Sequence, residues 1–415
     1  MDVVSGPGEF ALIVRLWNHS RVELLLGFAV ALMLAVLVSA LADRSVLSTA
    51  VVFLAAGVLI QGVGAVEESP GDVVEQIAEL ALFAVLFTDG MQVGIRDMAV
   101  AWRLPGRALL LGMPLTLVGT ALLGRWIVGL PWLEAFLLGA ALSPTDPVFA
   151  SAIVGRPEVP ARLRYLLNVE SGVNDGLALP VVLVLLAAAG GAEANVGEVA
   201  EELLLGVVVG VLIPLVAIRL EQSRFFAASG PYEQLNGFAI GVLVYAVGVV
   251  THANLFLAAF AAGVTVASTG PRAREAFHPF GEVVAELLKL AALFIFGTLL
   301  IPEVFTRAGL PVYVFAVLAV VIVRPVVLPV ALAGSRLNRA EYAVAAWFGP
   351  KGFASVVYGL IILQSGLADA PLLFELIALT ATASIVLHSS TDVAIADWFR
   401  DREEGERAAD AEEQA

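Results

Sequence analysis

Cysteine is absent from this chain of 415 residues, and charged residues make up only 15% of it. Without cysteine the protein can form neither a disulfide nor a thiolate metal site. Basic and aromatic residues are not interleaved in any segment, so nucleic-acid binding has little support. A basic region followed by a small-residue cleavage site is also missing from the N-terminus, which predicts that it is not cleaved. No ATP-binding motif or redox cofactor site is apparent, and no cofactor is expected.

Hydrophobic residues account for 60% of the chain, and the mean hydropathy is +0.92. A membrane-spanning helix needs about 20 apolar residues, and segments of this kind recur along nearly the whole length. Backbone groups must satisfy one another in lipid, so we predict an all-α polytopic membrane protein with one membrane domain over residues 1–400. About thirteen spans are predicted, near residues 22–41, 46–62, 74–93, 106–129, 131–155, 164–189, 203–220, 235–251, 254–269, 281–300, 311–333, 341–363 and 371–390.

The orientation follows from the Lys and Arg residues between the spans. With the N-terminus outside, sixteen of the 23 Lys and Arg residues fall on the cytoplasmic side and four outside. The net charge of −15 comes largely from two acidic loops, predicted to be outside, and from residues 401–415, predicted to be a disordered cytoplasmic tail. The sequence thus predicts a multi-pass protein of the cell (inner or plasma) membrane, with its C-terminus in the cytoplasm.

Two spans in opposite halves of the chain are interrupted near their centres, at Pro144–Pro147 and at Gly349–Gly352. Proline lacks an N–H and disturbs the residue before it, so both segments are predicted to unwind. Under the predicted topology these two spans run in opposite directions. Two broken helices of this kind are typical of inverted-repeat transporters.

The first interruption carries Thr145 and Asp146 between its prolines. Unwound backbone at this depth is tolerated only where it is buried or lines a cavity. Freed carbonyls, the Thr145 hydroxyl and the Asp146 carboxylate are hard oxygen ligands that suit Na⁺, Li⁺ or K⁺. The alternative is a kinked helix in which Asp146 caps the N-terminus of a half-helix.

The next span carries Glu170, Ser171, Asn174 and Asp175. Ser171 and Asp175 are four residues apart and share a helix face, with Glu170 and Asn174 on a neighbouring stripe. Removal from water favours the protonated form of a carboxylate, whereas a nearby cation favours the ionised form. Asp175 is therefore predicted to hold either a proton or a metal ion. A polar packing cluster between helices is the alternative.

Lys351 lies near mid-depth in the second broken span and is predicted to pair with Glu170, because a buried cation needs an anion. The alternative is a lysine that snorkels to the interface. Arg324, before Pro325, also needs a partner, which the sequence does not identify. Asp89 is either a water-mediated contributor to the ion site or a plain interfacial carboxylate.

Elsewhere, Glu282, Glu286 and Lys289 are spaced for pairing along one helix. Pairing among these three side chains is the favoured interpretation.

Together these motifs resemble those of monovalent cation/proton antiporters of the NhaP type, relatives of the animal sodium/proton exchangers. The resemblance is carried by Thr145-Asp146-Pro147, by Glu170 to Asp175 and by Trp347 to Gly352. It implies the antiporter fold shared by the NhaA and NhaP types. It also implies exchange of Na⁺, with Li⁺ and K⁺ as alternatives, for H⁺.

The resemblance further implies roles for individual residues. Asp175 would be the essential proton and cation carrier, and Asn174 would position the site. The other members of the monovalent-cation site would be Asp146, the Thr145 carbonyl and Ser171.

Around this site, Asp89 would join through water, and Glu170 would pair with the basic residue of the second broken span. That residue is usually arginine in the family and is Lys351 here. The Asn174-Asp175 pair resembles the electroneutral branch of the family, so one-for-one exchange is expected.

A homodimer is also implied. Spans 4–6 and 11–13 (about 104–189 and 311–390) would form a core that moves against a dimerisation scaffold of spans 1–3 and 7–10 (about 22–93 and 203–300).

Two other classes of membrane protein fit the sequence less well. An intramembrane enzyme is not favoured, because HExxH, GxGD and Asp-rich prenyl-pyrophosphate motifs are missing. A sodium-coupled symporter of a small organic anion should present cationic or amide groups rather than two mid-depth aspartates.

Overall fold

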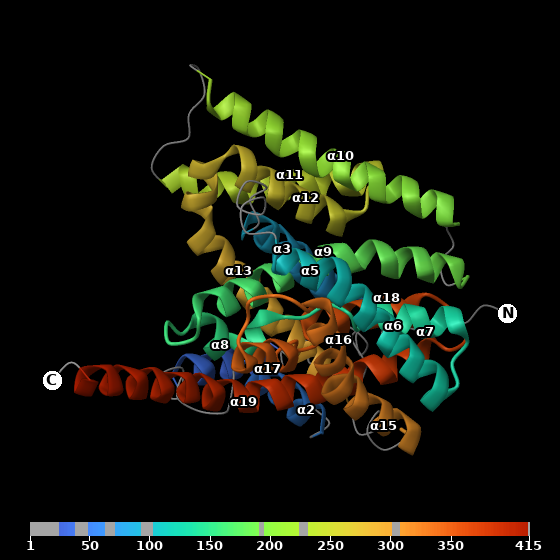
Figure 1. Ribbon diagram of the computed structural model, residues 1–415. Coiled ribbons are helices and arrows are strands. Elements are labelled where there is room, and N and C mark those ends of the chain that lie inside the picture. Colours follow the sequence, from blue (N-terminus) through green and yellow to red (C-terminus); the bar gives the residue numbers. More distant parts are fainter. Residues whose placement is uncertain are drawn as a thin grey trace.

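The computed structural model of the protein describes residues 25–37, 49–62, 71–92, 103–190, 195–223, 231–300 and 308–413. Within these ranges every regular element is a helix (Figure 1), which confirms the predicted all-α fold. Residues 1–24 and the acidic pair Glu67-Glu68 lie outside the described residues.

The chain order of the helices begins with an unlabelled helix at Leu25–Leu37. The labelled elements that follow are α2 (Thr49–Gly62), α3 (Gly71–Gln92), α5 (Pro105–Arg107), η1 (Ala108–Gly112), α6 (Met113–Leu123), η2 (Gly124–Val128), α7 (Trp132–Ala141), η3 (Pro147–Ala150), α8 (Ser151–Gly155), α9 (Ala161–Ala188), α10 (Val196–Glu221), α11 (Pro231–Thr251), α12 (Leu255–Thr269), α13 (Pro271–Leu299), α15 (Leu310–Leu318), η4 (Ala319–Val323), α16 (Arg324–Ala331), α17 (Arg339–Trp347), α18 (Phe353–Gln364) and α19 (Ala370–Glu413).

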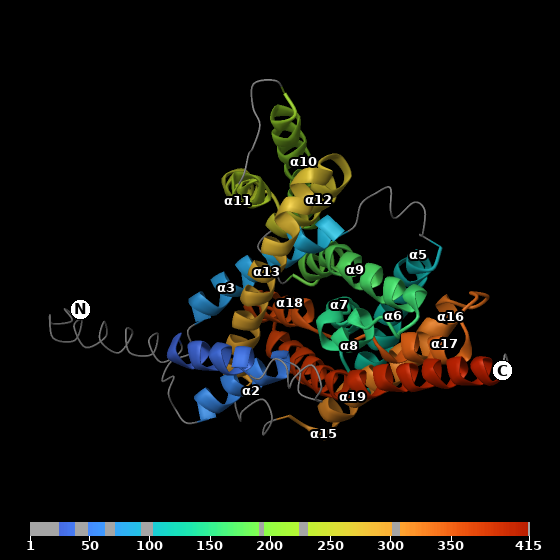
Figure 2. The same cartoon turned by 90° about the vertical axis from the view of Figure 1, so that its left-hand side faces the viewer.

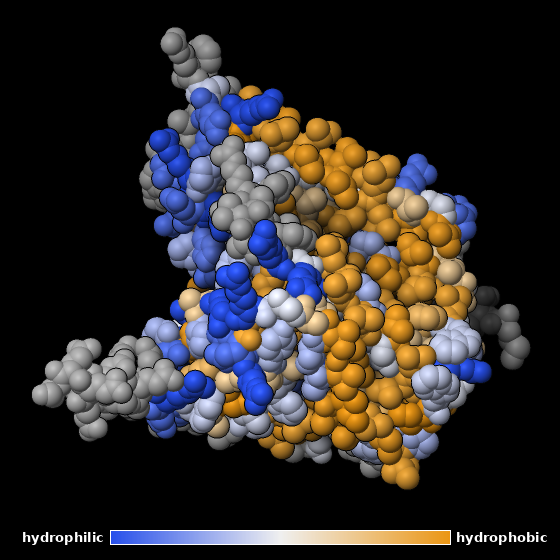
Figure 3. Space-filling view, in the orientation of Figure 1, coloured by the Kyte–Doolittle hydropathy of each residue, from blue (hydrophilic) through white to orange (hydrophobic). Residues whose placement is uncertain are grey.

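Each predicted span coincides with a helix or with a pair of half-helices in the described residues. Within the described part of the chain, six helical segments are long and apolar enough to cross a membrane, and shorter apolar helices accompany them. Figure 3 shows a broad apolar band, with hydrophilic residues gathered mainly on the side from which α19 emerges. The protein is therefore a multi-pass membrane protein.

The helices pack in two groups (Figure 2). In the first group, α12 packs against α3 and α10, and α13 packs against α2 and α3. In the second group, α6 packs against α7, α7 against α9, and α18 against α19. The two groups meet where α9 contacts α3, α10 and α12, and where α18 contacts α3 and α13.

The C-terminal tail differs from the prediction. Residues 401–413 were expected to be disordered, but α19 continues without interruption from Ala370 to Glu413. The physical reason is that Ala, Glu and Arg are good helix formers, and elongation of an existing helix avoids the unfavourable nucleation step.

Candidate functional site

The two predicted interruptions are real, and they meet. Helix α7 ends at Ala141, and the chain stays irregular until the 3-10 turn that begins at Pro147. Helix α17 ends at Trp347, and α18 begins at Phe353. The Asp146 N–H donates to the Pro350 carbonyl across 2.9 Å, so backbone freed by one break satisfies backbone freed by the other.

Charged side chains lie at the half-helix ends. Asp146 Oδ2 accepts from the Phe353 N–H at the N-terminus of α18, at 3.2 Å. The Lys351 ammonium donates to the Ser143 and Pro144 carbonyls, at 3.4 and 3.3 Å, just beyond the C-terminus of α7. An anion and a cation thus each face the helix end of opposite partial charge. The capping role considered for Asp146 is present, but it is directed at the other broken helix.

A glycine is needed where the two breaks approach each other. A Cβ atom on Gly352 would clash with the Asp146 side chain and with the Phe149 ring. The neighbouring Lys351 N–H donates to the Ser384 hydroxyl at 2.7 Å, which ties this break to α19. Substitution at Gly352 would therefore push Asp146 out of place.

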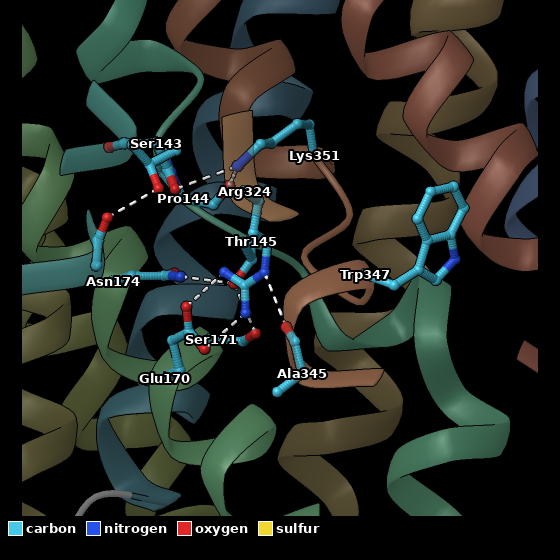
Figure 4. Close-up of polar contacts among 12 residues, drawn as sticks. Ser143, Pro144, Thr145, Glu170, Ser171, Asn174, Arg324, Ala345, Trp347 and Lys351 are labelled. Atoms are coloured by element: carbon cyan, nitrogen blue, oxygen red, sulfur yellow. Dashed lines mark hydrogen bonds and ion pairs between the residues drawn. The ribbon is translucent and has the colours of Figure 1, made fainter. Parts of the chain in front are cut away.

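Helix α9 lays its polar stripe against the first break (Figure 4). The Ser171 and Thr145 hydroxyl oxygens are 3.0 Å apart, and the Asn174 amide donates to the Thr145 hydroxyl at 2.8 Å. The Tyr358 hydroxyl of α18 donates to the backbone carbonyl of Asp175 at 2.7 Å. Three of the predicted site residues, Thr145, Ser171 and Asn174, are thus joined by hydrogen bonds. Tyr358 was not foreseen, because a tyrosine in an apolar span gives no signal of its own.

Two oxygens at this site have no protein partner. Asp175 is only 5% exposed, and its Oδ1 atom accepts no hydrogen bond in the described part of the chain. The Asn174 Oδ1 atom is also buried and has no hydrogen-bond partner in the described residues. Buried polar atoms are nearly always paired, so these two unpaired oxygens are candidates to bind a proton or a cation.

Asp89 approaches the site from α3. It is half-buried and close enough to Asp175 and Asp146 to act on both electrostatically. No direct hydrogen bond joins it to these carboxylates in the described residues. Its water-mediated role stays a prediction.

The predicted ion pair between Glu170 and Lys351 is wrong. Glu170 pairs instead with Arg324, whose two terminal nitrogens donate to the two carboxylate oxygens at 2.6 and 2.9 Å (Figure 4). A guanidinium presents a planar fork that matches both oxygens, whereas an ammonium is a point charge. The unpartnered Arg324 in an apolar span was the signal that could have identified this pair.

Local structure places Arg324 at this position. The π-helical turn η4 ends immediately before it, and Pro325 follows it without an N–H to donate. The Arg324 Nε atom donates to the Ala345 carbonyl of α17 at 3.3 Å. A Cβ atom on Gly349 would clash with the arginine side chain, so glycine is required there.

Lys289 has its closest acidic partner on a remote part of the chain. Its spacing favoured pairing with Glu282 or Glu286, and Glu286 is close enough to act on it electrostatically, but its ammonium lies 3.5 Å from Asp146 Oδ1. Glu282 instead pairs with His278, at 3.4 Å. A lysine in mid-span was the available signal, but its partner lies on a helix remote in sequence.

Comparisons with known proteins agree with this geometry. Residues 28–398 match the family described as sodium/hydrogen exchanger, transmembrane. The chain is 26% identical over 355 residues to the K⁺/H⁺ antiporter NhaP of Alkalimonas amylolytica, covering 84% of this chain and 62% of that protein. It is 24% identical over 375 residues to the K⁺/H⁺ antiporter NhaP2 of Shewanella oneidensis, covering 86% of this chain and 63% of that protein.

Among solved structures, the sodium proton antiporter MjNhaP1 of Methanocaldococcus jannaschii at pH 8 superposes with a TM-score of 0.76. The superposition covers 92% of this chain and 98% of that one, at 17% identity, and shows that the fold is shared. The chain spans somewhat less than two thirds of the length of the two curated relatives.

Proposed function

Because the chain belongs to the transmembrane sodium/hydrogen exchanger family, we propose that it is a secondary-active antiporter exchanging Na⁺ or K⁺ for H⁺. Membership of this family favours exchange over the organic-anion symport that the sequence left open. It is also a family of transporters rather than enzymes. The ion gradients would supply the driving force, each tenfold concentration ratio being worth about 1.4 kcal/mol.

The observation that carries the proposal is the unpartnered, buried Oδ1 atom of Asp175. A proton or a monovalent cation would bind there, but not both, because each removes the charge that attracts the other. The Asn174 amide oxygen and the hydroxyls of Thr145 and Ser171 are neutral oxygens suited to complete the cation's coordination. Two mutually exclusive occupants at one carboxylate are the minimum that exchange requires.

We further propose that the second helix group moves as a core against the first. The packing of α12 and α13 on α3, and of α7 and α18 on other helices of their own group, supports this division. The first group would carry the homodimer interface, the N-terminus would be outside and the C-terminus cytoplasmic. For cation and proton movement to be tightly coupled, the core must not move readily between its two orientations while the site is empty and unprotonated.

The proposed exchange can be tested in everted vesicles that contain the protein and have an acidic interior. Addition of Na⁺, Li⁺ or K⁺ is expected to release protons from the lumen and to restore the fluorescence of a quenched pH dye. The cation that acts at the lowest concentration identifies the substrate. Vesicles that fail to respond to all three cations would refute cation/proton exchange.

Exchange is expected to be electroneutral. Of the three carboxylates in the two motifs, Asp146 faces Lys289 and Glu170 faces Arg324. Asp175 alone lacks a fixed positive partner in the described residues, so one cation should replace one proton. Proteoliposomes adsorbed to a sensor electrode should show no sustained current. Currents whose sign follows an imposed membrane potential would contradict this stoichiometry.

A further inference from the structure

Lys289 brings a positively charged side chain to Asp146, one of the carboxylates of the proposed ion site. Its side chain rises from the middle of α13, is only 10% exposed, and ends 3.5 Å from Asp146 Oδ1. The other oxygen of that carboxylate accepts from the Phe353 N–H. Lys289 therefore neutralises a carboxylate that is fixed at the crossing of the two broken helices.

The surroundings of Lys289 are acidic. Besides Asp146, the carboxylates of Asp175, Asp89 and Glu286 are close enough to act on its ammonium electrostatically. These groups come from α9, α3 and α13 itself. An incoming Na⁺ or K⁺ would be attracted by the same charges, and it carries the same single positive charge as the ammonium.

The ion pair also joins the two helix groups. Lys289 belongs to α13, which packs against α2, α3 and α11, whereas Asp146 lies between α7 and α8. One flexible side chain makes this connection, so it can be broken without the loss of any backbone hydrogen bond.

We infer that Lys289 is a built-in stand-in for the transported cation. Its ammonium balances Asp146 while the ion site is empty and competes with the incoming cation for that carboxylate. Lys289 is thereby a determinant of cation affinity for the exchange proposed above, on which this inference rests. It acts through Asp146 as a positioning residue, and it is not itself transported.

The test compares Lys289→Met with the wild type in proteoliposomes, with the apparent KM for Na⁺ and K⁺ measured at the most alkaline pH that supports exchange. Removal of the competing ammonium leaves the negative charge of Asp146 unbalanced by Lys289, so KM is expected to fall about tenfold, the equivalent of about 1.4 kcal/mol. Lys289→Arg keeps the positive charge and should stay within about twofold of the wild-type KM. Arg272→Gln removes a positive charge at the exposed end of the same helix and should leave KM unchanged.

A merely structural lysine would lower the maximal rate or the yield of folded protein without tightening KM. An unchanged or raised KM in a folded Lys289→Met variant would overturn the inference. If that variant does not fold, Lys289→Gln, which keeps a polar amide in the site, must show the same fall in KM. Loss of cation-driven proton movement in the wild type would instead refute the proposed function, so the two failures are distinguishable.

Discussion

Asp175→Asn is expected to abolish cation-driven proton release, with exchange falling to the level of empty vesicles. The substitution keeps the size of the side chain and its place on α9, but an amide can neither lose a proton nor present a full negative charge. Neither of the two exclusive occupants could then be held. The measurement is the same dye response in everted vesicles, titrated with Na⁺ and K⁺ up to saturating concentrations.

The substitution should not harm the fold. The backbone carbonyl of Asp175, which accepts from Tyr358, is unaffected, and the orphaned Oδ1 atom makes no hydrogen bond that could be lost. Thermal stability in detergent should therefore equal or exceed that of the wild type, because removal of a buried unpaired charge relieves a desolvation cost.

Asp392→Asn is the matched control for Asp175→Asn. Asp392 is another buried aspartate, on α19, and its carboxylate accepts from the N–H groups of Ala152 and Val393. Asparagine has the same shape and keeps one of the two accepting oxygens, and Asp392 lies outside the proposed ion site, so exchange should persist. Exchange that survives Asp175→Asn would refute the proposed mechanism, and equal losses in both variants would show that any buried acid matters.

Arg324→Met is expected to give the largest loss of stability. It would strand Glu170 as an unpaired buried charge, which typically costs about 3–5 kcal/mol. Both residues are at most 5% exposed, and the guanidinium also holds α17 through the Ala345 carbonyl. The midpoint of thermal unfolding in detergent should fall steeply. The double variant Glu170→Gln/Arg324→Met should lose less than the sum of the two single variants, because no charge is left unpaired.

Arg162→Gln provides the comparison. Arg162 makes a similar two-pronged pair with Glu341, at 2.7 and 2.5 Å, but its side chain is 48% exposed. Glu341 is buried, but it also accepts from the Asn338 N–H, and water can reach the space that Arg162 leaves, so the loss of stability should be smaller than at Arg324. A variant at Arg162 that is less stable than the one at Arg324 would contradict this expectation.

The local features were predictable from the sequence. Apolar length located the spans, and the prolines at 144 and 147 located the first break, because both are properties of a short stretch of chain. The placement of Ser171 and Asp175 on one helix face, with Glu170 and Asn174 on the neighbouring stripe, followed from helical periodicity. The helical tail was missed because its acidic charge was taken to favour disorder, whereas the segment continues an existing helix.

The pairing of the buried charges was decided by the tertiary structure. Glu170 and Arg324 are 154 positions apart, and nothing in either segment states which helix faces which. Sequence reasoning paired Glu170 with Lys351, and it paired Lys289 with a residue of the same helix. In the structure, the rotation and depth of the helices bring Arg324 to Glu170 and Lys289 to Asp146. The sequence thus determined which charges enter the membrane, because burial follows from the apolar residues around them. Only the packed helices decided which charges neutralise one another and which carboxylate remains available, because charge pairing depends on distances of a few ångströms between segments remote in the chain.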